Sequence, residues 1–336
     1  MQENQEKVID VVAVDLGNGF IKSTDDGENV KIEPAVYSPF KNLFQLSSKK
    51  INPISVNDGE SVLIGQEALE SGFPYKSALG ESDSRRYYSK EYKDLLFGTI
   101  GKHLGESGEV RMLVLGLPNK HFLDPEIKKD LIEMVKGRKI VKIGDAEMVI
   151  NIQDALVIPQ PVGSLIYLQS EGKEFLGRVL VVDGGYGTLD LSEVKQQNVV
   201  DYQQKDLGLK QAYKSVASLL ERKLGDTEFH INEIPHLLKN GIPVNGRIIH
   251  PLEEFPEVGE ILNQHFEELY SFVIDCYGSL RKFESVVWTG GVALAHHQRI
   301  LEKHHLTDSQ NSIILTNGQV ANAQGFYQYG FGWLHA

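Results

Sequence analysis

The chain lacks the features that define several large classes of protein. Cys276 is its only cysteine among 336 residues, which excludes a disulfide framework and predicts a reducing cytoplasm. No apolar run approaches the roughly 18 residues that a membrane-spanning helix needs. The first seven residues are polar, unlike a signal peptide. We therefore expect a soluble cytoplasmic protein without a membrane partner.

Basic residues are also scarce relative to acidic ones. Lys and Arg number 34 against 46 Asp and Glu, giving a net charge of −12. A general nucleic-acid binder gains affinity from Lys and Arg on phosphates, so direct binding of nucleic acid is not expected. The length leaves room for two α/β domains, and 41% hydrophobic with 24% charged residues is an ordinary globular composition.

Residues 178–194 are the most informative stretch. A run of β-branched and aliphatic residues predicts a buried strand that ends on Asp183, followed by Gly185-Tyr186-Gly187 and a returning alternating strand. The two glycines let backbone N–H groups approach phosphate oxygens. An Asp beside phosphate would repel it, unless a divalent cation lies between them. The pattern predicts a site for phosphate and metal.

The same pattern occurs near the N-terminus. Residues 11–24 align without gaps on residues 179–192. The alignment pairs Asp15 with Asp183, Gly17 with Gly185, Gly19 with Gly187, and Lys22 with Asp190. A third match aligns the strand at 112–118 with that at 286–292. We infer two halves built alike, with a nucleotide held in the cleft between them.

Three further positions are candidates for the chemistry. Lys22 follows the first turn closely enough to reach a β- or γ-phosphate, although it could be a solvated strand lysine. Gln160, between two prolines, could orient a water for attack on the terminal phosphate, or merely fill the bend. Gly290 and Gly291, between a strand and a helix, suit close approach of an adenine or ribose.

Periodicity predicts the regular elements. Strands are expected at 8–14, 20–23, 29–33, 62–65, 110–115, 140–143, 147–152, 178–183, 189–194 and 285–289. Helices are expected at 66–71, 89–104, 124–135, 162–169, 211–224, 257–282, 292–303 and 317–329. Domain I is expected at 1–165 with an irregular insertion at about 34–84, and domain II at 166–316. Residues 317–336 are expected to form a C-terminal helix that returns to domain I.

Two polar clusters are not assigned a site. His296, His297, His304 and His305 are interpreted as a solvated helix face, because adjacent residues point about 100° apart on a helix. Residues 85–88 (Arg-Arg-Tyr-Tyr) are weak support for nucleic-acid stacking in an acidic protein.

The motifs Asp15-Leu-Gly-Asn18-Gly, residues 183–187 and residues 289–292 (Thr-Gly-Gly-Val) resemble those of the actin, Hsp70 and sugar-kinase superfamily. Within it, the sequence is most similar to plasmid-segregation actins of the ParM/StbA type, with archaeal actin-like proteins next. Residues 159–163, 206–209 and 317–326 support this resemblance, which covers nearly the whole chain.

The resemblance implies an α/β actin-like ATPase fold, in which two duplicated ribonuclease-H-like domains surround a nucleotide cleft. Asp15 and Asp183 would hold hydrated Mg²⁺, and Lys22 would contact the phosphates of ATP, or possibly GTP. Residues 17–19 and 185–187 would grip the phosphates, while Gly208 and residues 290–292 would border the nucleoside. The protein would polymerise head to tail with ATP bound, hydrolysis would destabilise the filament, and a ParR-type adaptor would attach plasmid or other DNA.

Other functions of the same fold remain open. A small-molecule kinase needs an acidic base near its acceptor, and the nearest candidate, Asp124, suits a helix cap better. A cell-shape or division actin would need a membrane anchor, which the polar N-terminus does not supply. A chaperone would need a peptide-binding β-domain after the ATPase.

Overall fold

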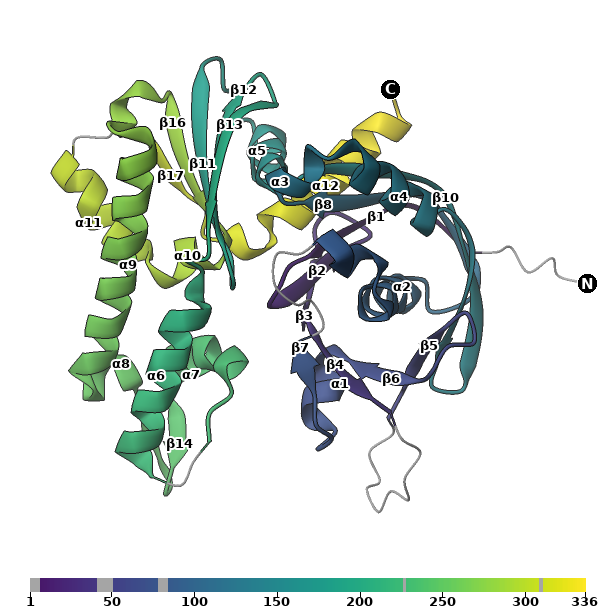
Figure 1. The fold of residues 1–336 in the computed structure, drawn as a ribbon, viewed down its shortest axis with the longest axis horizontal. Coiled ribbons are helices and arrows are strands. Elements are labelled where there is room, and N and C mark those ends of the chain that lie inside the picture. Colours follow the sequence, from purple (N-terminus) through teal and green to yellow (C-terminus); the bar gives the residue numbers. More distant parts are fainter. Residues whose placement is uncertain (1–6, 41–50, 78–83, 226–227, 308–310) are drawn as a thin grey trace, which may run out of the picture. The chain divides into compact units, whose positions relative to one another are not determined.

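The computed structural model describes residues 7–40, 51–77, 84–225, 228–307 and 311–336 (Figure 1). The chain divides into two compact units: the first reaches Glu174 and includes Val320–Ala336, and the second is Phe175–Gln319. Sequence analysis placed the domain boundary after residue 165 and the return of the chain at residue 317. Among the described residues, no helix combines the length and apolarity required to cross a membrane.

The first unit is built on a ten-stranded sheet with the order β3-β2-β1-β8-β10-β9-β5-β6-β4-β7. Its strands are β1 Lys7–Leu16, β2 Phe20–Thr24, β3 Lys31–Pro34, β4 Val36–Pro39, β5 Ile54–Val56, β6 Val62–Ile64, β7 Lys76–Ser77, β8 Gly108–Leu117, β9 Gly137–Ile143 and β10 Ala146–Pro159. Its helices are α1 Gly65–Glu70, the 3₁₀ turn η1 Ser84–Tyr88, α2 Lys90–Leu104, α3 Asn119–Phe122, α4 Pro125–Val135, α5 Gln160–Ser170 and most of α12 Gly318–Leu334.

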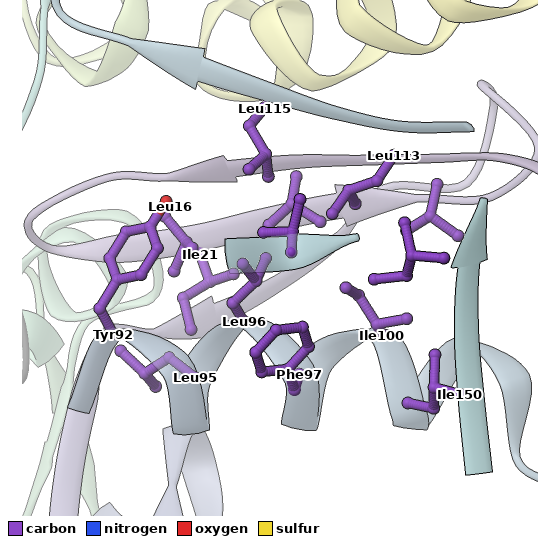
Figure 2. Close-up of a cluster of buried hydrophobic side chains, with 14 of the residues drawn as sticks. Leu16, Ile21, Tyr92, Leu95, Leu96, Phe97, Ile100, Leu113, Leu115 and Ile150 are labelled. Carbon is purple, nitrogen blue, oxygen red and sulfur yellow. The ribbon is translucent and has the colours of Figure 1, made fainter. Parts of the chain in front are cut away.

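Helix α2 covers one face of this sheet. Ser89 caps it by accepting a hydrogen bond from the Tyr92 backbone N–H, as the sequence predicts. Its apolar side chains point toward those of β1, β2 and β8, including Leu113 and Leu115 (Figure 2). All are buried, so this contact is the hydrophobic core of the first unit.

The C-terminal helix α12 lies against the opposite face of β1 and β8. A Cβ atom at Gly330 would meet the side chain of Val114 at 2.5 Å, and one at Gly325 would collide with the backbone of Gly163 in α5. Small residues at these crossings let α12 approach the sheet and α5 closely. Because both faces of the sheet are covered, its central strands are continuous apolar runs rather than alternating ones.

The second unit contains a five-stranded sheet with the order β13-β12-β11-β16-β17 and a separate hairpin, β14-β15. Its strands are β11 Arg178–Gly184, β12 Leu189–Lys195, β13 Asn198–Lys205, β14 Ile242–Val244, β15 Arg247–Ile249, β16 Ser285–Thr289 and β17 Ser312–Ile314. Its helices are α6 Leu209–Leu224, η2 Ile231–Glu233, α7 Ile234–Asn240, α8 Pro251–Glu254, α9 Pro256–Tyr277, η3 Leu280–Lys282, α10 Gly290–Ala295 and α11 His297–Thr307.

The internal repeat predicted from sequence is present in the strand pairing. Strands β1 and β2 pair antiparallel with Asp15 opposite Lys22, and β11 and β12 pair with Asp183 opposite Asp190. The two hairpins therefore have the same register, 168 residues apart (183 − 15). Each hairpin is followed by a parallel strand, β8 or β16, on the other side of its first strand. The actin-like α/β fold with two similar halves is confirmed.

The third sequence match is shifted by one residue. Val14 pairs with Leu115, and its counterpart Val182 pairs with Trp288, which places β8 and β16 173 residues apart. The sequence alignment used 174, because it matched Gly116 with Gly290 as glycines. In the structure Gly116 therefore corresponds to Thr289.

Several local predictions were wrong. Residues 34–84 are not irregular throughout: their described part forms β4 to β7 and α1, which extend the first sheet. The helix expected at 292–303 is interrupted at His296, and that expected at 257–282 ends at Tyr277. His296 and His304 are 0% and 8% exposed, so they do not belong to a solvated face. The side chain of His305 lies outside the described residues.

Candidate functional site

The first glycine hairpin places a lysine on an aspartate. Asp15 is almost fully buried at the end of β1, and Lys22 lies opposite it on β2. The Lys22 Nζ is 3.1 Å from Asp15 Oδ2. A Cβ atom at Gly17 would lie 2.9 Å from that Nζ, so glycine is needed for the lysine to pass. The cation thus lies directly beside the glycine turn.

Gln160 contacts the same aspartate from 145 residues away. It is the first residue of α5, directly after β10, rather than part of a rigid turn as expected from its two neighbouring prolines. Its Nε2 donates a hydrogen bond of 2.8 Å to Asp15 Oδ1. A carboxylate only accepts, so the amide must present its NH₂ group to Asp15. The amide oxygen of Gln160 is then the atom that would accept from a water molecule.

A second cation reaches the tip of this hairpin. Arg86 in η1 donates from Nη1 to Asn18 Oδ1 at 2.6 Å, and from Nη2 to the Tyr87 hydroxyl at 3.1 Å. Tyr87 is buried and lies 2.7 Å from Nδ1 of His121, and burial raises the pKa of its hydroxyl. Sequence analysis weighed Arg86 only as a nucleic-acid contact, because no local pattern links it to Asn18.

The second hairpin carries a carboxylate where the first carries Lys22. Asp183 and Asp190 are both half-buried and occupy paired positions on β11 and β12. The Thr188 hydroxyl donates to Asp190 Oδ2 at 2.8 Å. The two hairpins therefore have the same backbone but opposite charge at equivalent positions.

The N-terminus of α6 rests on the second hairpin. The backbone N–H groups of Gly208, Leu209 and Lys210 donate to the carbonyl oxygens of Gly187, Gly185 and Tyr186 at 3.1, 3.1 and 2.8 Å, respectively. A Cβ atom at Gly208 would lie 2.5 Å from the Tyr186 carbonyl oxygen. Only glycine permits this approach, which fixes Gly208 against the hairpin predicted to bind phosphate.

Helix α10 begins beside Asp183. Gly290 has φ of +76°, and a Cβ atom there would lie 2.6 Å from Asp183 Oδ1. Gly291 is half-buried beside Leu209. Val292 is fully buried against Gly184, so its backbone, rather than its side chain, is the part available to border a nucleoside. The second unit thus brings Asp183, Gly208 and the start of α10 around one hairpin.

The donor set fits a hard divalent cation. Among the described residues, no group of three or more His, Cys, Asp or Glu side chains forms a metal site. Mg²⁺, however, commonly uses one or two carboxylates, with phosphate oxygens and waters completing its shell. The paired carboxylates of Asp183 and Asp190 would repel each other, and a nearby cation would relieve that repulsion.

Comparison with known proteins agrees with this architecture. Residues 13–163 match the family model described as the N-terminal domain of actin-like proteins. No match is found among curated proteins.

Solved structures match over nearly the whole chain. The apo psk41 ParM crystal structure is 21% identical, covers 97% of this chain and 98% of its own, and has a TM-score of 0.73. The archaeal actin homolog Ta0583 in complex with ADP is 20% identical over 96% and 99%, with a TM-score of 0.75. A 15-stranded ParM filament from Clostridium botulinum is 18% identical over 96% and 99%, with a TM-score of 0.73.

Proposed function

Because this chain is an actin-like protein in its fold and in its N-terminal domain, we propose that it is an ATP-dependent filament-forming protein of the ParM type. It binds ATP with Mg²⁺, assembles head to tail, and destabilises the filament by hydrolysing ATP. The observation that carries this proposal is the repeated hairpin, with an aspartate at the same register position in both copies.

Each hairpin contributes backbone to the phosphates of ATP. Residues 17–19 act in the first unit and residues 185–187 in the second. Lys22 supplies positive charge beside the first hairpin, and Gly208 with residues 290–292 borders the nucleoside. GTP would be accepted wherever the base is held mainly by backbone and apolar contacts.

Hydrolysis is assigned to the cluster on Asp15. Asp15 and Asp183 would hold Mg²⁺, which neutralises developing negative charge on the phosphates. Gln160, oriented by its hydrogen bond to Asp15, positions the attacking water through its amide oxygen. Such a neutral residue orients a water without removing its proton, which suits slow hydrolysis that times disassembly.

Filament assembly and DNA segregation follow from the same proposal. Head-to-tail contact between identical subunits, when it does not close into a ring, gives an open filament. The charge of −12 implies that a separate basic adaptor of the ParR type links the filament to plasmid or other DNA. With a single cysteine in 336 residues, we place this activity in the cytoplasm.

Sedimentation over a concentration series, with and without Mg-ATP, tests the proposal. We expect a pellet above a critical concentration with ATP or a non-hydrolysable analogue, and its loss as hydrolysis proceeds. Asp183→Ala should abolish Mg-dependent hydrolysis, whereas Asp10→Ala, which removes only an exposed ion pair with Arg111, should not.

The contrary result is also defined. A chain that stays monomeric, and whose ATP consumption accelerates when a sugar or another hydroxyl acceptor is added, would be a small-molecule kinase. The structure offers no support for Asp124 as the base of such a kinase, because its carboxylate caps α4 by accepting from the N–H groups of Glu126 and Ile127.

A further inference from the structure

Two buried histidines form a hydrogen-bonded pair in the second unit. His265 lies on α9, and His296 lies at the break between α10 and α11; they are 7% and 0% exposed. The Nδ1 of His265 is 2.8 Å from Nε2 of His296, and the rings stack with centroids 5.1 Å apart. Neither residue belongs to the site proposed above.

The pair ends on a backbone carbonyl of that site. The Nε2 of His265 is 3.1 Å from the carbonyl oxygen of Gly208. Because a carbonyl only accepts, this Nε2 must carry a proton, and Nδ1 of neutral His265 must then accept from Nε2–H of His296. The Nδ1 of His296 is left as a buried lone pair with no hydrogen-bond partner in the described part of the chain. Neutral rings thus allow one arrangement of protons.

The contacts on either side of the pair give it a role. Gly208 donates from its own N–H to Gly187 of the second hairpin at 3.1 Å. At the other end, His296 terminates α10, where its backbone N–H donates to Val292 at 3.0 Å. The two imidazoles therefore link the start of α6 to the end of α10. These are the two elements that carry the residues assigned to the nucleoside.

We propose that His265 and His296 are positioning residues that hold Gly208 and α10 in the arrangement that binds the nucleotide, and that acid weakens binding by disrupting the pair. This inference rests on the proposed nucleotide site.

The groups around the pair explain why protonation is disruptive. A proton added at Nδ1 of His296 would be a buried charge without an acceptor, beside His265 and Arg299, which both disfavour it. A proton at Nδ1 of His265 would set two donors against each other. Glu268 favours charge on His265, but burial outweighs it and lowers the pKa of that ring. Phe266, which packs on His296, carries no charge.

The test measures ATP affinity of the full chain at pH 7.5 and 5.5. His265→Phe should weaken binding about tenfold at pH 7.5, the value of one lost hydrogen bond, leave the hydrolysis rate at saturating ATP unchanged, and flatten the pH dependence of affinity. His265→Gln, whose amide can donate to Gly208 and accept from His296, should restore most of the affinity. His304→Phe is the matched control, because His304 is a buried histidine of the same unit that contacts Trp288 and Ser312 instead.

A readout without nucleotide separates this proposal from the previous one. Amide hydrogen exchange at residues 208–210 should accelerate in folded His265→Phe but not in His304→Phe. If the native chain binds no ATP, the proposed function fails, whereas the exchange result still decides whether the pair positions Gly208. The inference is overturned if His265→Phe changes affinity and exchange no more than His304→Phe does.

Discussion

At the scale of single residues, Gln160 makes the most direct chemical prediction. Its amide is fixed to Asp15 by a hydrogen bond of 2.8 Å, so the side chain is already oriented without a ligand. Gln160→Ala should bind ATP almost normally but hydrolyse it roughly ten- to a thousand-fold more slowly, which corresponds to a few kcal/mol in the barrier. Filaments should then persist longer after assembly.

Single-turnover hydrolysis and equilibrium ATP binding distinguish the two effects. Gln66→Ala, which truncates an exposed glutamine of α1, is the matched control and should leave both unchanged. Loss of binding and hydrolysis together in Gln160→Ala would instead indicate a structural role through Asp15.

His296 makes a prediction about stability and pH. Burial, followed by the proximity of His265 and Arg299, lowers its pKa from 6.5 to about 3. The unfolded chain therefore binds a proton below pH 6.5 that the folded chain does not, so stability falls as the pH drops below 6.5, and this loss is complete near pH 3. At pH 5 the loss amounts to about 2 kcal/mol.

Urea unfolding at pH 7.5 and pH 5 measures this loss. The second unit of the native chain should lose about 2 kcal/mol more than that of His296→Phe, which has no group to protonate at that position. Equal losses in the two proteins would show that His296 does not account for the acid sensitivity.

At the scale of elements, the packing of α6 on the second hairpin depends on Gly208. An alanine Cβ there would lie 2.5 Å from the Tyr186 carbonyl oxygen, so the helix and hairpin must separate. Gly208→Ala should destabilise the protein by about 1–3 kcal/mol and weaken ATP binding at least as much as loss of one hydrogen bond.

Thermal denaturation and ATP titration of the same samples check this prediction. Gly259→Ala is the control, because nothing lies within 4 Å of an added Cβ at that position of α9. It should leave binding unchanged and stabilise the helix by up to about 1 kcal/mol. Similar behaviour of the two alanine variants would show that the contact between α6 and the hairpin tolerates the extra methyl group.

At the scale of the whole molecule, net charge determines which partners can bind. With −12 at neutral pH, the purified chain should not shift DNA in an electrophoretic assay at physiological salt, with or without Mg-ATP. A shift that weakens steeply with added salt would reveal a basic DNA-binding surface on this chain and remove the need for an adaptor.

Local features of the sequence were sufficient to predict the two hairpins and most of the central strands and helices. Alternation, turn glycines and helix caps act within a few residues, so Asp15 and Asp183 could be located from their neighbours alone. The repeat also predicted the shared register, because a hairpin's register is set by its own turn and face pattern.

Only the tertiary structure revealed the contacts between distant segments. Gln160 and Asp15 are 145 residues apart, and Arg86 and Asn18 are 68 apart. The burial of His296 could not be predicted, since it depends on α9 covering the junction of α10 and α11. Such contacts depend on how strands pair and helices pack over the whole unit, and no short sequence pattern contains that information.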